Sequence, residues 1–322
     1  MTMLAQLPKS TLFVFLSTLS VFGCSSDADP EKPAPFSLRF EALVDGKAVG
    51  CNDDLSGFGP SGEHHIGIND LRFYLSNPKF KDAQGREIET SLDENEFQYA
   101  SPDGAVALVD LTGNTEGSCS ATSVAYAEGT ARTHMALTGT TLVHQVSSVS
   151  FDVGVPQKLM QKTIATNTPE GSPSPLNEMY WNWNTGYRHF VFNFSVSDGS
   201  GATGGGYVHL GSRDCAPEGD GIKALDDRDA CTFINTPSFT LGSFNLETDA
   251  IGVDLRRIVE GVDFIAPVYD STTFEVIGEG PGVECHSSPM QPDCTPVFDS
   301  FGLSMSSGAA NAANDSVFVK TK

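Results

Sequence analysis

The sequence contains few basic residues. Its 322 residues include 19 Lys and Arg against 41 Asp and Glu, which gives a formal charge of −22 at pH 7. A protein that binds nucleic acid or an anionic membrane needs a basic face, so this balance argues against both classes. Charged residues make up only 19% of the chain, whereas Phe occurs 21 times. Disordered chains show the opposite composition, so we expect a folded protein with a sizeable core.

Motifs of several common protein classes are also absent. The sequence has no G-x-S-x-G elbow, H-E-x-x-H helix, G-x-x-x-x-G-K-[ST] loop or EF-hand spacing, so the corresponding mechanisms lack their minimum residue sets. It has no C-x-x-C or C-x-x-C-H unit either, which argues against a zinc ribbon, a thioredoxin-like redox pair and a covalently held c-type haem. A secreted hydrolase that uses unmatched carboxylates has only the acidic composition in its favour.

Apolar residues form a continuous run only near the N-terminus. The run from Leu12 to Phe22 is too short to span a membrane but is typical of the core of a signal peptide. Val21-Phe22-Gly23-Cys24 resembles a bacterial lipoprotein cleavage box. We therefore expect a signal peptide over residues 1–23, acylation of Cys24, and a polar tether over residues 24–35. An ordinary cleaved signal followed by a chance Cys is the alternative.

These N-terminal features predict a lipid-anchored protein of the cell envelope. Ser25 follows Cys24 where an Asp typically retains lipoproteins at the inner membrane, which favours the outer membrane. The remaining cysteines are even in number, which in an oxidising compartment implies three disulfides that staple the fold. Fifteen pairings are possible, and closeness along the chain favours Cys215–Cys231 and Cys285–Cys294, which leaves Cys51–Cys119.

Apolar and polar residues alternate with the period of half-buried strands along much of the chain. Gly-rich or Asp-rich joints separate these stretches, and only residues 254–259 look helical. Many short strands without βαβ alternation predict an all-β protein, with an antiparallel β-sandwich or jelly-roll-like body. We expect the body over residues 36–303 and a loose tail over 304–322. The expected strands are Leu38–Val44, Ile66–Ile68, Leu71–Leu75, Val106–Val109, Val146–Val153, Phe190–Val196 and Phe239–Leu246.

One segment concentrates unusual side chains. Residues 179–190 hold both tryptophans of the protein, Trp181 and Trp183, together with two tyrosines, a Met and His189. On a strand, Trp181 and Trp183 would share one face. Such a segment is either an aromatic core strand or part of a metal or redox site. Imidazole suits copper and zinc, but no two of the seven histidines have a spacing that specifies a site.

A series of blocks in fixed order resembles the MbnP-like copper-binding proteins, a metallo-mystery-pair four-Cys family. The resemblance covers nearly the whole mature chain. Its blocks are Phe40 with Gly46 and Cys51, D-L-R-F-Y-L-S from Asp70, G-V-P from Gly154, S-P-L-N from Ser174, M-x-W-x-W-x-x-G-Y from Met179, H-L-G-S-x-x-C from His209, Cys231, and Cys294 with Phe298 and Gly302.

The resemblance implies a protein that holds one copper ion and is not itself an enzyme. It also implies a dihaem cytochrome-c-peroxidase-like partner that oxidises a tryptophan to kynurenine, whose aniline nitrogen can join imidazoles on copper. By position, Trp181 and Trp183 are the candidates for modification, and His209 is the metal ligand that lies within a family block. His189, His64 and His65 are further candidate ligands from local context.

The sequence departs from this family in one segment. An Asn-His pair is expected soon after G-V-P, but the segment from Gln157 to Lys162 has no histidine. The thioether of Met160 could replace the missing ligand, because it suits Cu(I), and His64 with His65 could also compensate. The departure also supports the alternative of a metal-free β-sandwich lipoprotein with an interaction or structural role.

Overall fold

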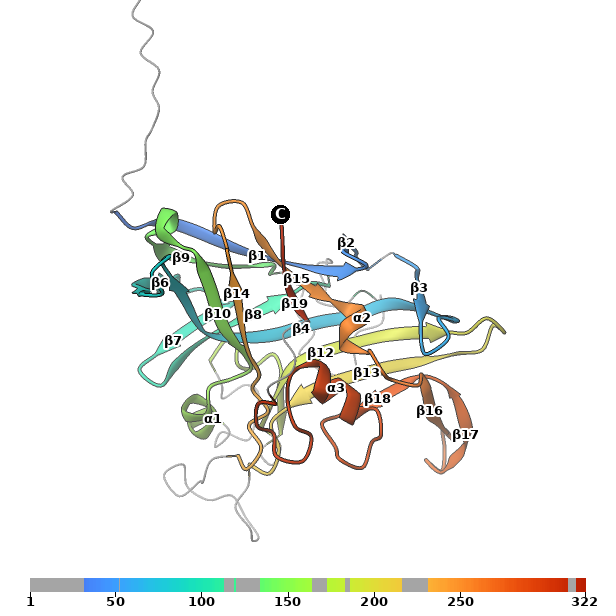
Figure 1. Ribbon diagram of the computed structural model, residues 1–322. Coiled ribbons are helices and arrows are strands. Elements are labelled where there is room, and N and C mark those ends of the chain that lie inside the picture. The colour runs from blue at the N-terminus through green and yellow to red at the C-terminus, as the bar shows by residue number, and fades with distance from the viewer. Residues whose placement is uncertain are drawn as a thin grey trace, which may run out of the picture.

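The computed structural model describes residues 32–51, 53–112, 119, 134–163, 173–182, 186–215, 231–311 and 317–322. Its regular structure is almost entirely β, in two facing sheets and a two-stranded hairpin (Figure 1). The predicted all-β sandwich is confirmed. The sheets are mixed, because β1 (Ala34–Val44) runs parallel to β15 (Ala250–Asp254), and β13 (Thr203–Gly211) runs parallel to β18 (Val283–Cys285). The predicted signal peptide and Cys24 lie outside the described residues. No described helix is long and apolar enough to cross a membrane.

The smaller sheet contains the N-terminal and C-terminal strands of the body. Its strand order is β19-β15-β1-β9-β6, and β2 pairs with β1. The strands are β1 (Ala34–Val44), β2 (Lys47–Ala48), β6 (Thr90–Leu92), β9 (Ala136–Thr141), β15 (Ala250–Asp254) and β19 (Phe318–Thr321).

The larger sheet forms the second layer. Its main order is β14-β10-β4-β12-β13-β18, with β11 on β12, β3, β5 and β8 on β4, and β7 on β8. The strands are β3 (Leu55–Phe58), β4 (His64–Lys81), β5 (Glu87–Ile88), β7 (Gln98–Ser101), β8 (Gly104–Asp110), β10 (Ser148–Val153), β11 (Tyr180–Asn182), β12 (Gly186–Ser197), β13 (Thr203–Gly211), β14 (Ser238–Gly242) and β18 (Val283–Cys285).

The remaining elements lie around the two sheets. Strands β16 (Ile265–Tyr269) and β17 (Val276–Pro281) form a separate hairpin. The expected helical piece is present as α2, which the side chain of Asp254 caps by accepting from the backbone N–H groups of Arg256 and Arg257. The helices are η1 (Val143–Gln145), α1 (Gln157–Thr163), α2 (Leu255–Ile258) and α3 (Cys294–Ser300).

The main core lies between the two sheets and is rich in phenylalanine. Phe40 of β1 packs edge-on against Phe73 of β4, with ring centroids 5.6 Å apart. Phe318 of β19 packs against Phe73, Phe151 and Phe239. Aromatic rings bury the largest apolar area per residue, so these contacts hold the layers together.

The central part of the long strand β4, residues 70–76, is buried on both faces. A register shift opposite Asn193 and Phe194 inserts Asn69 as an extra residue between Ile68 and Asp70, and such a bulge changes the face that the following side chains occupy. Ile66 and Ile68 before the bulge, and Leu71, Phe73 and Leu75 after it, enter the main core. Asp70, Arg72 and Tyr74 therefore project from the opposite, outer face of the larger sheet.

The outer face carries a second, smaller core. Tyr74, Val106, Leu108 and Val191 of the sheet pack there against Leu159 and Met160 of α1, and against residues 176–180. The larger sheet is thus covered on both sides around this core, where polar side chains such as Asp70 and Arg72 are buried.

The C-terminal end is not the loose tail that the sequence suggested. β19 pairs antiparallel with β15, and Phe318 is fully buried in the main core. The sequence gives little indication of this strand, because only four residues form it and most of the residues before it are small or polar. Residues 304–311 are described as turns and a bridge from Leu303 to Ala310.

Three disulfides are present among the described residues. They join Cys51 to Cys119, Cys215 to Cys231, and Cys285 to Cys294, the pairing that closeness along the chain favours. The last bridge closes the loop between β18 and α3.

Candidate metal centre

His209 lies on the outer face of the larger sheet. Its neighbours in sequence, Val208 and Leu210, point into the main core, so strand alternation directs the imidazole to the other side. There it is 1% exposed. On the neighbouring strand β12, Val191 is its register partner, and Asn193 lies two residues further along on the same face.

His286 follows the last residue of β18 and lies beside His209. The parallel register of β13 and β18 aligns Val208 with Cys285, and one residue further along brings His209 level with His286. The Nδ1 atoms of the two rings are 2.9 Å apart. Residues 77 positions apart in the sequence thus present two ring nitrogens to one point.

Hydrogen bonds hold the loop that carries His286. The Ser287 hydroxyl donates to the carbonyl of His209 and accepts from the N–H of Gly211, both at 2.8 Å. The Gln291 side chain accepts from the backbone N–H of His286 at 2.7 Å. Together with the Cys285–Cys294 bridge, these contacts fix the position of the His286 backbone.

Asn193 determines which nitrogen of His209 is available. The Nε2–H of His209 donates to Oδ1 of Asn193 at 2.8 Å. The proton of the neutral ring is therefore on Nε2, and the lone pair is on Nδ1, the atom that faces His286. A hydrogen bond of this kind on the outer nitrogen is typical of metal-ligating histidines.

Both imidazoles are held in the neutral form. Burial lowers the pKa of His209 well below its usual value, and the nearby His286, Arg188 and Arg72 lower it further. Burial also lowers the pKa of His286. A metal ligand must be a neutral imidazole, so both rings have the required charge at neutral pH. In this arrangement the Nδ1–H of His286 donates to Nδ1 of His209, and this proton would have to leave Nδ1 for His286 to bind a metal.

Trp181 is the third aromatic group at this point. Its ring is 6.2 Å from that of His209 and 6.5 Å from that of His286, edge to face in both cases. The residue is half-buried. A Cβ atom on Gly211 would lie 3.1 Å from Cζ3 of Trp181 and 2.5 Å from the carbonyl oxygen of Tyr187, so the absence of a side chain at Gly211 allows the indole to approach the sheet.

A buried ion pair lies on β4, on the outer face of the larger sheet that also carries His209. Arg72 donates from Nε and Nη2 to the two carboxylate oxygens of Asp70, at 2.8 and 2.7 Å. Both residues are at most 2% exposed. Because Val191 is in register with both Arg72 and His209, the guanidinium lies close enough to add to the charges that keep His209 neutral.

The histidine pair fits a metal ion that accepts imidazole ligands. Metal–imidazole bonds are about 2.0–2.1 Å long, so two nitrogens on one ion lie within about 4 Å of each other, as the two Nδ1 atoms do. Among the described residues, no group of three or more His, Cys, Asp or Glu side chains is placed so that it could hold a metal ion. Within the part of the chain that the structure describes, a third protein ligand would therefore come from another kind of group. An intact indole has only an N–H donor, so Trp181 could serve only after modification.

His189 was predicted as a candidate ligand, but both of its ring nitrogens have protein partners. Nε2–H donates to the carbonyl of Ile234 at 2.8 Å, and Nδ1 accepts from the N–H of Val155 at 3.3 Å. Burial lowers its pKa to about 4, although the hydrogen bond to Ile234 opposes the shift. His189 therefore joins structural segments in its neutral form.

His64 and His65 lie far from the pair. His65 is in register with Ser197, whereas His209 is in register with Val191, six residues or roughly 20 Å away along β12. The ring of His64 packs against Phe264 at 5.2 Å, and Nδ1 of His65 is 3.1 Å from Asp54. These two histidines do not complete the site.

Other predicted residues have different surroundings or are not described. Met160 is fully buried among the apolar side chains of the second core. Trp183, the second candidate for modification, lies outside the described residues, as does Cys24. The structure thus brings together His209 and Trp181 of the predicted residues.

Sequence reasoning did not select His286. The residue has no helical or strand spacing to His209, and its only local signal is its position directly after Cys285, at the start of a short disulfide-closed loop. The parallel pairing of β18 with β13 brings it to the site, and such non-local pairing is not encoded in a local motif.

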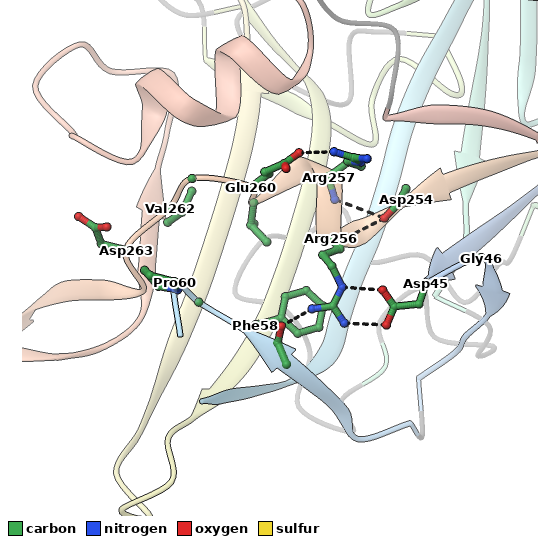
Figure 2. A pocket seen from close by; sticks show the side chains of 14 residues that line it. Asp45, Gly46, Phe58, Pro60, Asp254, Arg256, Arg257, Glu260, Val262 and Asp263 are labelled. Carbon is green, nitrogen blue, oxygen red and sulfur yellow. Dashed lines mark hydrogen bonds and ion pairs between the residues drawn. The ribbon is translucent and has the colours of Figure 1, made fainter. Parts of the chain in front are cut away.

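A cavity of about 750 Å³ lies elsewhere, between β3 and α2. Figure 2 shows the side chain of Arg256 among the residues that line this cavity. The guanidinium donates to both carboxylate oxygens of Asp45 at 2.9 Å and to the carbonyls of Ser56 and Gly57, and it stacks over Phe58. Because the protein already uses its donors, Arg256 ties β3 and α2 together rather than offering a ligand site.

The fold and the site define a disulfide-bridged β-sandwich with a buried histidine pair beside a tryptophan. The MbnP family model matches residues 33–276, and the chain belongs to the MbnP family. Among solved structures, MbnP from Methylosinus trichosporium is similar, with a TM-score of 0.65 at 22% identity over 90% of this chain and 98% of that chain. A search of curated proteins finds no match.

Proposed function

We propose that this protein binds one copper ion through His209 and His286 and acts in the cell envelope as a lipid-anchored partner of a redox enzyme. The observation that carries the proposal is the pair of buried, neutral imidazoles whose Nδ1 atoms are 2.9 Å apart. Membership of the MbnP family supports copper rather than another metal, and imidazole is a suitable copper ligand.

Trp181 is the proposed site of modification by a dihaem cytochrome-c-peroxidase-like enzyme. Two equivalents of peroxide would insert two oxygen atoms into the indole and leave as two waters, which gives N-formylkynurenine. Hydrolysis would then release formate and leave kynurenine. The aniline nitrogen so exposed has a lone pair that the indole N–H lacks, and it would lie next to the histidine pair.

Metal analysis of purified variants tests copper binding. We expect one copper per wild-type chain, measured by mass spectrometry of the metal after removal of excess ion. His209→Ala and His286→Ala should each lose it, and His144→Ala, an exposed histidine beside Glu247, should retain it. Equal copper in all four proteins, or none in the wild type, would contradict the proposal and favour a metal-free interaction or structural lipoprotein.

Peptide mass spectrometry tests the modification separately. Protein from the native host should carry a tryptic peptide in which one carbon of Trp181 has been replaced by one oxygen. Protein produced without the haem enzyme should carry the unmodified peptide. An unmodified peptide from the native host would refute the modification but leave copper binding by the histidines to be judged on the metal analysis.

A further inference from the structure

Exposed apolar side chains are concentrated on the β16–β17 hairpin. The described residues include nine large hydrophobic side chains that are exposed, and six of them lie on this hairpin. We call these six the hairpin surface: Ile265, Val268, Tyr269, Phe274, Val276 and Ile277. In Figure 1 the hairpin extends from the body beside β18. Exposed apolar residues gathered on one element in this way mark an interaction site.

The turn of the hairpin adds a second unusual feature. Phe274 is 78% exposed and has a φ of 58°, in the left-handed region that bulky residues rarely adopt. An aromatic side chain therefore occupies a strained position without gaining burial. Strain of this kind is typical of functional segments, and here it presents the ring to solvent.

The hairpin surface is continuous with the histidine pair. Strand β17 packs beside β13, and β16 packs beside β18. The hydroxyl of Tyr269 contacts the carboxylate of Glu284 at 3.5 Å, and Glu284 is the register partner of Tyr207. The ring of Tyr207 stacks on His286 at 6.1 Å and is 47% exposed. Tyr207 thus connects the surface beside the hairpin to the buried pair.

Charge identifies the kind of partner. No Lys or Arg occurs between Arg257 and Lys320, whereas carboxylates flank the hairpin surface at Asp263, Asp270, Glu275, Glu279 and Glu284. This acidic rim would repel a second copy of the chain and an anionic bilayer. It would attract a partner whose apolar patch is ringed by basic residues.

We propose that the hairpin surface, with Tyr207, docks a redox protein whose apolar contact patch is rimmed by lysines and arginines. The proposal rests on the proposed function only in taking the partner to be a redox protein. Electron-transfer complexes use small interfaces, and an acidic rim would accelerate encounter with such a partner. The partner would then contact Tyr207, whose ring lies against His286.

Mitochondrial cytochrome c, a basic redox protein with a lysine-rimmed haem edge, is the probe for the test. It is titrated into the isotope-labelled, metal-free protein carrying Cys24→Ser, and amide shifts are followed by NMR. We expect shifts confined to the hairpin and the region around Tyr207, and affinity that falls with added salt. Using metal-free protein separates this result from copper binding.

Variants of exposed residues identify the contact. Phe274→Ser with Ile277→Ser, and separately Glu275→Lys with Glu279→Lys, should each weaken binding about tenfold or more. Met135→Ser, at another exposed apolar residue, should leave the affinity unchanged. Thermal unfolding checks that each variant is folded, and the two hairpin variants test apolar and charged contacts independently.

Three outcomes would overturn the proposal. The first is no cytochrome c binding, and the second is binding that both hairpin variants retain in full. The third is hairpin-dependent dimerisation in sedimentation, or hairpin-dependent binding to phosphatidylglycerol vesicles, in place of cytochrome c binding. Loss of copper binding with retained docking would instead contradict only the proposed function.

Discussion

Asn193 contributes to the candidate site by orienting His209. Its side-chain oxygen accepts the Nε2 proton and so leaves Nδ1, the nitrogen that faces His286, without one. Residues in this position do not contact the metal, but their loss typically weakens metal binding 10- to 100-fold. The availability of Nδ1 of His209 thus depends on a residue outside the family blocks recognised in the sequence.

We therefore expect Asn193→Ala to weaken copper binding by about 10- to 100-fold. The buried Nε2–H would lack its acceptor, and the ring could adopt the other tautomer. Competition with a chromophoric copper chelator measures the change. Asn193→Asp retains an oxygen acceptor and should bind copper more tightly than the Ala variant. Equal affinities for the wild type and Asn193→Ala would show that Asn193 does not orient His209.

His189 makes a different contribution, to the pH dependence of stability. Burial lowers its pKa in the folded protein to about 4, whereas the unfolded chain takes up the proton near pH 6.5. A lowered folded-state pKa means that stability is present above pH 6.5 and is lost as the pH falls towards 4. A difference of this size corresponds to about 3 kcal/mol.

Chemical denaturation at pH 7 and at pH 4 tests this linkage. The free energy of unfolding of the wild type should fall by about 3 kcal/mol more than that of His189→Gln over this interval. Comparing the change in unfolding free energy between the two proteins removes the contribution of the carboxylates, which both proteins share. Parallel pH profiles for the two proteins would show that His189 titrates normally in the folded state.

Among the elements, the loop between β18 and α3 links stability to the site. Cys285 ends β18, Cys294 begins α3, and His286 lies directly after the first of them. The bridge therefore restrains the backbone of a candidate ligand as well as the unfolded chain.

The double variant Cys285→Ala with Cys294→Ala should have two effects. Loss of a bridge across so short a loop should cost about 2–3 kcal/mol of unfolding free energy, and copper affinity should fall at least about tenfold because His286 is less restrained. The matched control is Cys51→Ala with Cys119→Ala, a bridge not adjacent to the pair. It should lower stability and leave copper affinity unchanged. The same loss of affinity in both double variants would indicate a general effect of stability.

Elements formed by local patterns could be predicted from the sequence, and elements formed by distant pairing could not. Alternation identified strands such as Leu38–Val44 and Phe190–Val196, and the helical appearance of residues 254–259 identified α2. The bulge at Asn69, by contrast, depends on the partner strand β12. For the site, the family block identified His209 and Trp181, whereas His286 reaches them only through the parallel pairing of β18 with β13.

At the scale of the whole molecule, the C-terminal strand completes the sandwich. Phe318 contacts three phenylalanines of the facing sheet, Phe73, Phe151 and Phe239. The sequence does not indicate this role, because the segment before the strand is low in complexity and a four-residue strand gives almost no periodic signal. Strand β19 thus contributes to the centre of the core.

Phe318→Ala should lower the free energy of unfolding by about 3–5 kcal/mol, because it removes a ring from a closely packed interior. Val319→Ala, on the half-buried side of the same strand, should cost much less. Denaturant titration monitored by tryptophan fluorescence compares the two. A stability loss below about 1 kcal/mol for Phe318→Ala would mean that the terminal strand does not pack in the core.

Alternate residues of a strand in the larger sheet face either the main core or the histidine pair. Along β12, Phe190, Phe192 and Phe194 belong to the main core, whereas Val191 and Asn193 face the histidine pair. Substitutions at alternate positions of β12 therefore act either on the main core or on the second core and the surroundings of the histidine pair. A metal donor introduced at Val191, level with His209, would add to the proposed ligand set but would also remove an apolar side chain from the second core.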